Sequence, residues 1–237
     1  MSSPRLVPPP LPIAWAAPPR GRVVVFAPHA DDDVIGCGGA SALHRAQGDP
    51  VQVVVLTSGL SGDPDGRYGR EELLALRERE ARSGGAVLGI EDYAFWRYPD
   101  GYEVTDADVE QLAESVRAHL ERVRPDLVYY PWPREAHSDH WIAALGIERA
   151  LERLSFACAA WGYEVWTPCV ADVVLDISAV VEKKRAALRE HASQLQYTDL
   201  VHMSLGLCAQ RSLYLPKGAT HGEAFVRWRG RGGARWV

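Results

Sequence analysis

The sequence lacks the features that mark membrane-spanning, disulfide-stapled and nucleic-acid-binding proteins. No apolar run reaches the roughly 18 to 20 residues that a helix needs to cross a bilayer. The four cysteines are widely spaced and form no C-x-x-C pair, which predicts reduced, mostly buried thiols and a cytoplasmic protein. The net charge is −5 and no basic stripe stands out, so a general nucleic-acid binder is not expected.

A secretory leader and a dinucleotide-binding loop are not expected either. Residues 1–21 are dense in proline, which does not suit the helical core of a signal peptide and predicts an extended or disordered arm on the domain surface. Gly36, Gly38 and Gly39 follow an acidic cluster and form no G-x-G-x-x-G motif. The short Arg-rich segment 227–235 is interrupted by Gly and Trp, and we expect it to be a solvated terminus.

What the chain does have is enough apolar sequence for one large core. Of its 237 residues, 47% are hydrophobic, which is enough for one large core. The composition therefore favours a single α/β domain that spans residues 22–237 and follows an N-terminal arm of residues 1–21. Apolar runs of strand length alternate with amphipathic segments, which indicates a mainly parallel sheet covered by helices on both faces. The predicted strands are 23–27, 51–56, 93–98, 126–130, 170–177 and 223–228, and the predicted helices are 34–47, 71–88, 106–122, 141–154 and 178–192.

One imidazole and three carboxylates follow the first of these strands. The segment reads Val23-Val-Val-Phe-Ala-Pro-His-Ala-Asp-Asp-Asp33, and a glycine-rich helix start comes directly after it. Open α/β sheets carry their binding sites at the carboxyl ends of strands, so a site is expected here. Capping and the helix dipole alone also favour acidic residues at a helix start, and this alternative stays open.

A second cluster of imidazoles and carboxylates, His137-Ser-Asp-His140, follows the predicted strand 126–130. Ordinary surface histidines are the structural alternative. Since both clusters come just after a strand, we expect them to meet at one sheet edge around a metal ion.

Together the two clusters contain the parts of a hydrolytic metal site. A catalytic zinc takes three protein ligands and keeps one position open for water, and His29, Asp32 and His140 are the natural ligands. Asp31 is then a candidate base, and His137 a candidate acid or oxyanion stabiliser. With a bound metal, such a set can hydrolyse an unactivated amide.

At these residues the chain resembles the PIG-L-like (LmbE-like) zinc de-N-acetylases. That family has a strand followed by Ala/Pro-His-Pro-Asp-Asp-Glu, and later His-x-Asp-His; the corresponding segments here are Pro28-His-Ala-Asp-Asp-Asp33 and His137-Ser-Asp-His140. The resemblance spans roughly residues 22–228. Its further matches are an Arg-x-x-Glu helix at Arg77 and Glu80, an Asp-Gly turn at Asp100, a late helix at 184–194 and a terminal segment at 222–225.

The resemblance implies a three-layer, Rossmann-like αβα fold and a role for each motif residue. It implies that a zinc ion binds to His29, Asp32 and His140, and that Asp31 is the general base. By the same resemblance His137 is the acid or carbonyl polariser, oriented by Asp139. The family's usual substrates are N-acetylglucosamine units attached to a lipid, an inositol, a malate or an antibiotic core.

Two departures from the family pattern leave the proposed ligands intact. Ala30 stands where proline is usual, which makes the loop less stiff. Asp33 stands where glutamate is common. Because its side chain is shorter, the family pattern does not identify the group that it contacts.

Four more residues are candidates for binding a sugar. Arg77 can reach a hydroxyl or belong to a salt-bridged helix face, and Asp100 can bind a hydroxyl or form a plain turn. Tyr130 and Trp132 precede the second cluster and can line a sugar pocket or pack in the core. Trp166 is expected to pack rather than to line the site.

We therefore expect a metal-dependent hydrolase that removes an N-acyl group, most often acetyl, from an amino sugar or its conjugate. Two histidines and one aspartate suit Fe²⁺ as well as Zn²⁺, so the metal stays open. A metallophosphatase or other phosphoester hydrolase is the first alternative, and a non-catalytic carbohydrate-binding protein is the second. The expected partner is a small N-acetylated sugar conjugate, and a homo-oligomer is left open.

Overall fold

Eight strands form one sheet in the computed structural model, which describes residues 10–101 and 104–230. The strand order is β1-β7-β8-β6-β5-β2-β3-β4, and β8 is the strand that pairs antiparallel with both of its neighbours. The bounds are β1 Ile13–Trp15, β2 Val23–Ala27, β3 Val51–Thr57, β4 Asp92–Tyr98, β5 Leu127–Pro131, β6 Ala159–Tyr163, β7 Val173–Asp176 and β8 Gly222–Arg227.

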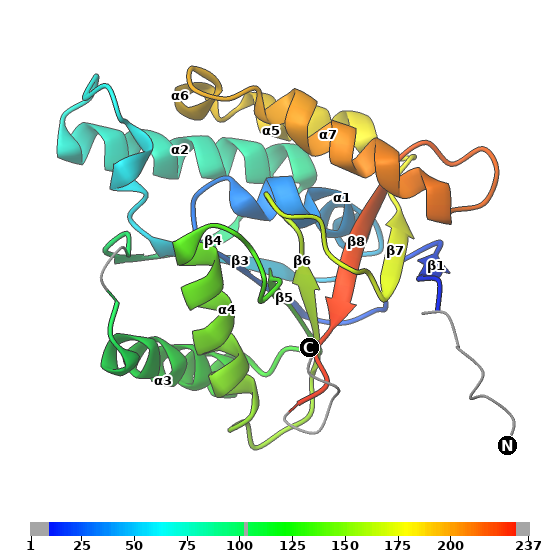
Figure 1. Cartoon of the computed structure of the whole chain (residues 1–237), viewed down its shortest axis with the longest axis horizontal. Coiled ribbons are helices and arrows are strands. Elements are labelled where there is room, and N and C mark those ends of the chain that lie inside the picture. The colour runs from blue at the N-terminus through cyan, green and yellow to red at the C-terminus, as the bar shows by residue number, and fades with distance from the viewer. Residues whose placement is uncertain (1–9, 102–103, 231–237) are drawn as a thin grey trace, which may run out of the picture.

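Helices cover both faces of this sheet (Figure 1). One face carries α1 (Asp32–Ala46), α2 (Arg70–Leu88), α5 (Val181–Arg189), α6 (Ala192–Leu195) and α7 (Leu200–Arg211). The other face carries α3 (Asp106–Val123) and α4 (Ser138–Leu151). Two 3₁₀ helices, η1 (Leu60–Gly62) and η2 (Ser212–Tyr214), lie in connections. The predicted three-layer αβα fold with a mainly parallel sheet is confirmed.

Strand β2 shows how the sequence produces these layers. All five of its residues are buried. Val23, Val25 and Ala27 belong to the core under α1 and α5, whereas Val24 and Phe26 belong to the core under α3 and α4. Because successive strand residues point to opposite faces, a strand covered on both sides is a continuous apolar run in the sequence.

The sequence did not predict strands β1 and β6 or helix α7, nor α6, η1 and η2 as separate short helices. Strand β6 contains Gly162 and no β-branched residue, and helix α7 follows a cap at Asp199, whose side chain accepts from the backbone N–H of His202. Strand β1 lies within the proline-rich segment and pairs with β7, so residues 13–15 of the predicted arm belong to the sheet. Residues 1–9 of that arm and 231–235 of the Arg-rich segment lie outside the described residues.

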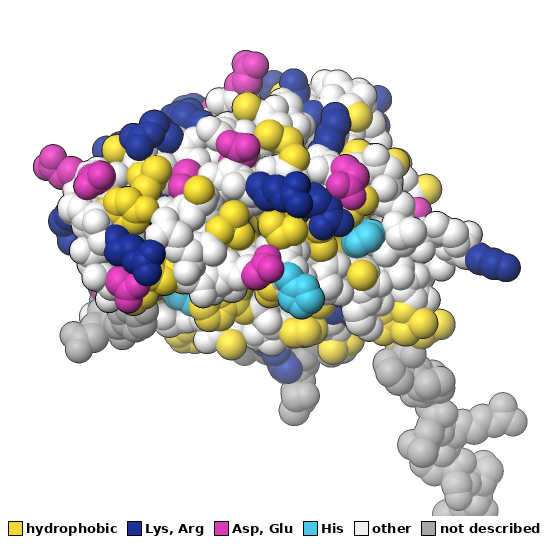
Figure 2. Space-filling view, turned by 90° about the horizontal axis from the view of Figure 1, so that it is seen from above, with side chains coloured by type: hydrophobic (Ala, Val, Ile, Leu, Met, Phe, Trp, Pro, Cys, Tyr) yellow, Lys and Arg dark blue, Asp and Glu magenta, His cyan; other side chains and the backbone are white. Residues whose placement is uncertain are grey.

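The surface and the cysteines agree with the composition. Figure 2 shows basic and acidic side chains interspersed with hydrophobic ones on the face that carries α2, α5 and α7. Among the described residues, no helix has the length and apolar character to cross a membrane. All four cysteines are free, and Cys37, Cys169 and Cys208 are buried, as predicted.

The close packing of α1 against β6 predicts opposite effects for two helical glycines. A Cβ atom on Gly36 would lie 2.1 Å from Cδ2 of Tyr163, whereas one on Gly206 in α7 would meet no group within 4 Å. We expect G36A to lower the free energy of unfolding by about 1–3 kcal/mol through overpacking. We expect G206A to raise it by about 0.5–1 kcal/mol. Urea unfolding measures both, and shifts of the same sign would contradict this account.

Candidate metal centre

The pairing of β2 with β5 brings the two predicted clusters together. These strands are parallel neighbours, with Val23 opposite Leu127 and Val25 opposite Tyr129. The chain continues from β2 to β3 on one side of the sheet, while β5 lies on the other side. The strand order therefore reverses at this point, where open α/β sheets form a crevice beyond the strand ends. His29 follows β2 and His140 lies beyond β5, so both side chains reach this crevice.

The loop that carries His29 is fixed by hydrogen bonds. The carbonyl of Pro28 accepts from the backbone N–H and from Oγ1 of Thr57, both at 2.9 Å. The backbone N–H of His29 donates to Oδ2 of Asp32 at 2.8 Å. These contacts hold the loop although Ala30 replaces the usual proline.

Three side chains converge on one point in this crevice. Nδ1 of His29 lies 3.1 Å and Nε2 of His140 lies 3.2 Å from Oδ2 of Asp32. The two nitrogens are 3.3 Å apart. Tetrahedral zinc with bonds of about 2.0–2.2 Å places its ligand atoms about 3.3 Å from one another. The donor set and its spacing therefore fit a single divalent ion.

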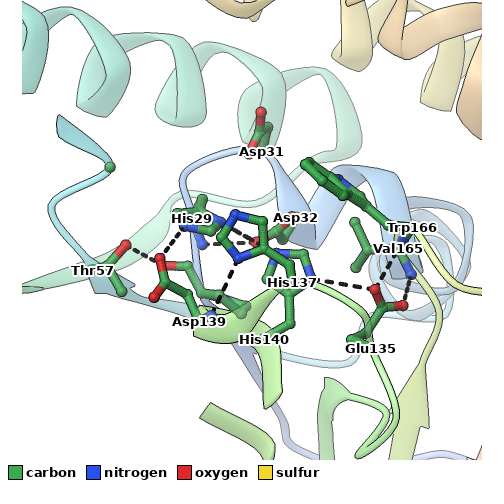
Figure 3. Close-up of polar contacts among 12 residues, drawn as sticks. His29, Asp31, Asp32, Thr57, Glu135, His137, Asp139, His140, Val165 and Trp166 are labelled. Carbon is green, nitrogen blue, oxygen red and sulfur yellow. Dashed lines mark hydrogen bonds and ion pairs between the residues drawn. The ribbon is translucent and has the colours of Figure 1, made fainter. Parts of the chain in front are cut away.

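A carboxylate lies beside the outer nitrogen of each imidazole (Figure 3). Nε2 of His29 lies 3.0 Å from Oδ2 of Asp139, and Nδ1 of His140 lies 3.5 Å from Oε2 of Glu135. Metal-binding histidines commonly have such partners, which fix the tautomer and the ring orientation. Glu135 was not identified from the sequence.

The carboxylate of Asp139 contacts a different imidazole from the one expected. The sequence predicts that Asp139 orients His137, but its carboxylate lies against His29 and accepts from the backbone N–H of Gly101 at 2.7 Å. His137 is the N-cap of α4, and its Nδ1 accepts from the backbone N–H of Asp139 at 3.2 Å. The cap therefore engages Nδ1 of His137 with the helix backbone and not with that carboxylate.

A second group of potential ligands overlaps the first. The ligand atoms of His29, His137 and Asp139 also lie within 4.8 Å of one another. This group shares His29 with the set that includes Asp32 and His140. The described residues therefore offer one complete, independent set of three ligands here.

The three imidazoles differ in the direction in which their surroundings shift the pKa. Burial opposes the charged form of His29 and His140, but neighbouring carboxylates raise the pKa of His29 to about 9 and that of His140 to about 10. Burial also opposes ionised Asp32, yet His140 and His29 hold its pKa well below the usual range. Burial and the two other imidazoles lower the pKa of His137. Because Nδ1 of His137 accepts a hydrogen bond, its neutral ring carries the proton on Nε2.

Asp31 and Asp32 point in different directions. Figure 3 shows Asp32 within the imidazole cluster and Asp31 pointing away from it, towards α2. On α2 the buried Arg77 places Nη2 3.4 Å from Oδ1 of Asp31 and donates from Nη1 to the carbonyl of Gly59 at 2.7 Å. Asp31 thus stays outside the set of three ligands and next to a cation.

Most of these groups line one cavity of about 590 Å³, but His140 and Glu135 are not part of its wall. Among the predicted residues, its wall includes His29, Asp31, Asp32, Arg77, Asp100, His137 and Asp139. Trp166 also lines it, with the side chain exposed and its ring 5.0 Å from that of His137 at 88°. The prediction that Trp166 packs away from the site is therefore wrong, because β6 ends at Tyr163 and the following loop carries Trp166 to the cavity.

Asp100 lines the cavity and also fixes the neighbouring loop. Its carboxylate accepts from the backbone N–H groups of Gly59 at 2.7 Å and Ser61 at 2.6 Å. Burial opposes ionisation, but these hydrogen bonds lower the pKa of Asp100.

The two aromatic residues before the second cluster lie in the core instead. Tyr130 is buried and its hydroxyl donates to Oε1 of Glu148, while Nε1 of Trp132 donates to the carbonyl of Thr167. Neither contributes to the cavity wall. Tyr130 belongs to strand β5, which is covered on both faces. The structure therefore places Tyr130 and Trp132 in the core and not at the proposed substrate-binding positions.

The side chain of Asp33, which stands where glutamate is common in the family, contacts Tyr93. The hydroxyl of Tyr93 in β4 donates to Oδ2 of Asp33 at 2.7 Å. Burial raises the pKa of Asp33 to about 7, although this hydrogen bond opposes the rise. Asp33 therefore links the start of α1 to the sheet.

The contact between Asp139 and His29 predicts a specific loss of metal affinity. We expect D139N to weaken Co²⁺ or Zn²⁺ binding about 10–100-fold, because the amide holds the imidazole less firmly. D100N is the control, since Asp100 lines the same cavity and contacts loop N–H groups instead. Competition with a chromophoric chelator measures both. Equal losses in the two variants would contradict a specific role for Asp139.

Comparisons with known proteins agree with this geometry. The PIG-L family model, described as GlcNAc-PI de-N-acetylase, matches residues 24–151. A Bacillus subtilis protein named probable N-acetyl-alpha-D-glucosaminyl L-malate deacetylase 2 is 31% identical over 190 residues, covering 75% of this chain and 85% of that protein. The structure of N,N'-diacetylchitobiose deacetylase from Pyrococcus horikoshii is similar with a TM-score of 0.73 and 25% identity, covering 87% and 83% of the two chains.

A relative with a different reaction is similar as well. The 4-oxalmesaconate hydratase of Pseudomonas putida is 27% identical over 222 residues, covering 82% of this chain and 83% of that protein. The same framework therefore occurs in a protein named for hydration rather than for deacetylation.

Proposed function

Because the chain belongs to the PIG-L family, we propose that it is a metal-dependent hydrolase that removes the N-acetyl group from an amino sugar or an N-acetylglucosamine conjugate. The convergence of His29, Asp32 and His140, at distances that suit one ion, carries this proposal. The names of the Bacillus subtilis and Pyrococcus horikoshii relatives support it, since both specify the deacetylation of N-acetylated sugars.

The proposed ion is Zn²⁺, held by His29, Asp32 and His140. Fe²⁺ is the alternative, since two imidazoles and a carboxylate suit both. When bound, such an ion polarises the amide carbonyl and makes water more acidic. Asp139 accepts from the outer nitrogen of His29, and Glu135 lies 3.5 Å from that of His140, so each ring would present its other nitrogen to the ion.

Two further side chains would take part in the reaction. Asp31 lies outside the ligand set and would accept the proton of the attacking water. Arg77 lies beside this carboxylate and orients it through the contact at 3.4 Å. His137 carries its proton on Nε2 and would donate a hydrogen bond from it to the acetamide oxygen. The proton that Asp31 takes from the water would then pass to the leaving nitrogen.

The cavity suits a sugar conjugate. Its volume of about 590 Å³ lies within the about 300–1,000 Å³ of small-molecule sites. Arg77 and Asp100 line it, and we propose that the hydrogen-bonding capacity left by their loop contacts serves sugar hydroxyls.

We also propose that residues 22–237 form a single catalytic domain, to which β1 of the arm is added at the sheet edge. The free cysteines support the proposed cytoplasmic location.

The alternatives have weaker support. A two-metal phosphoester hydrolase needs more ligands, whereas the two groups of potential ligands among the described residues share His29. A carbohydrate-binding protein needs neither the base at Asp31 nor the donor at His137. A hydratase would use the same cavity without releasing acetate.

A substrate panel tests the proposed reaction. We expect purified protein loaded with Zn²⁺ to release acetate and free amine in equal amounts from at least one N-acetylglucosaminyl conjugate. The same preparation should release no phosphate from phosphomonoesters and should not hydrate unsaturated dicarboxylic acids. Phosphate release or hydration without any acetate release would overturn the deacetylase proposal.

Removing the proposed base should separate metal binding from turnover. We expect D31N to bind Zn²⁺ with wild-type stoichiometry, because Asp31 is not a ligand, and to lose about 10²–10⁴-fold in kcat. Metal analysis and acetate release measure the two effects. A D31N variant with wild-type kcat would exclude Asp31 as the base.

Metal removal gives an independent check. We expect a chelator to abolish deacetylation and one equivalent of Zn²⁺ or Fe²⁺ per chain to restore it. The comparison of the two restored rates identifies the better metal. Full activity after verified removal of all divalent metal would rule out the proposed centre.

A further inference from the structure

Helix α1 is broken one turn after its first proposed ligand. Cys37 has φ −143° and ψ 26°, which is not helical. In a regular helix the N–H of Gly39 donates to the carbonyl of Ile35. Here the N–H of Gly39 donates to Oε1 of Glu223 at 2.7 Å, and the carbonyl of Ile35 accepts from Nζ of Lys184 at 2.7 Å.

Lys184 and Glu223 complete this bridge by an ion pair of 2.6 Å between Nζ and Oε1. Lys184 and Glu223 are thus inserted into one helix hydrogen bond, and Oγ of Ser204 on α7 also donates to the carbonyl of Ile35 at 3.2 Å. Insertions of this kind bend helices. The position of the bend in α1 is therefore set by a side-chain pair and not only by the helix itself.

The bridge is buried and makes further contacts with α1. Lys184 lies on α5 with 0% exposure and Glu223 lies on β8 with 2% exposure. Oε2 of Glu223 accepts from the N–H of Ala40 at 2.7 Å. Because a buried charge that loses its partner is strongly destabilised, each charge keeps the other in place against α1.

The residues before the bend are the ones that carry the proposed chemistry. Asp32 is the first residue of α1 and Asp31 is its N-cap. The N–H of Ile35 donates to the carbonyl of Asp31 at 2.9 Å, and Ile35 itself lines the cavity. A rotation of this first turn would therefore move both carboxylates relative to His140, which is carried by α4.

We propose that Lys184 and Glu223 are positioning residues that hold the first turn of α1, and with it Asp31 and Asp32, in place for metal binding. The inference rests on the metal centre proposed above. Neither side chain belongs to the cavity wall. Both act through the backbone of α1 and not by touching the substrate.

A second buried ion pair provides a matched control. Arg211 and Glu164 are 5% and 4% exposed. Nε of Arg211 donates to Oε1 of Glu164 at 2.9 Å, and Glu164 accepts from the N–H of Cys169. The hydrogen bonds of this pair involve the loop after β6 and not α1. Disrupting it removes a comparable buried pair without touching the bend.

The experiment compares K184M and E223Q with R211M and E164Q. We expect all four to unfold at lower urea concentration than the wild type. Only K184M and E223Q should weaken Co²⁺ binding, by about 10–100-fold, and change the visible spectrum of bound Co²⁺. E223Q preserves the shape and a hydrogen-bonding oxygen, so it reports on the bridge even if K184M does not fold. K184R keeps the charge and should restore most of the affinity.

The outcomes separate this inference from the proposed function. Folded K184M and E223Q with wild-type affinity and spectrum would overturn the positioning role, as would equal losses in R211M. A wild type that binds no Co²⁺ would overturn the metal centre and the inference together. Normal Co²⁺ binding without acetate release from any conjugate would overturn the deacetylase function alone.

Discussion

The carboxylate of Asp32 lies between two imidazoles that reach it from different strand ends, and the rest of the site is arranged around this contact. His29 comes from the end of β2, and His140 from the helix that follows β5. All three side chains are largely buried, which is unfavourable for charged groups unless opposite charges lie beside them. The parallel pairing of two buried strands brings these side chains together, although His29 and His140 are 111 positions apart in the sequence.

Backbone groups keep the surrounding carboxylates in place. Glu135 accepts from the N–H groups of Val165 and Trp166, and Asp139 accepts from Gly101. A carboxylate that accepts hydrogen bonds from fixed backbone N–H groups has few orientations. The backbone N–H groups of Gly101, Val165 and Trp166 therefore act on the imidazoles indirectly, through these two carboxylates.

The sequence was sufficient to predict those strands and site residues that can be recognised from neighbouring residues in the chain. The buried strands are uninterrupted apolar runs, and His29, Asp31 and Asp32 were identified because they directly follow one. Glu135 and Trp166 could not be identified in this way, because their contacts with the imidazoles depend on how the loops after β5 and β6 lie in three dimensions. The short strand β6 was not predicted because its sequence contains a glycine and no β-branched residue. Its Gly162 is explained by Trp132, whose Cα would lie 2.9 Å from an added Cβ.

The glycine-rich start of α1 is explained by packing. A Cβ atom on Gly36 would overlap the ring of Tyr163, and one on Gly39 would lie 2.6 Å from Cγ2 of Ile177 and 3.0 Å from Oε1 of Glu223. The helix can therefore lie close to β6 and accept the Glu223 carboxylate at its backbone only with glycines at these positions. The same glycines that resemble a phosphate-binding loop in composition allow the bend in α1. The bend, in turn, determines where its acidic first turn meets the histidine of α4.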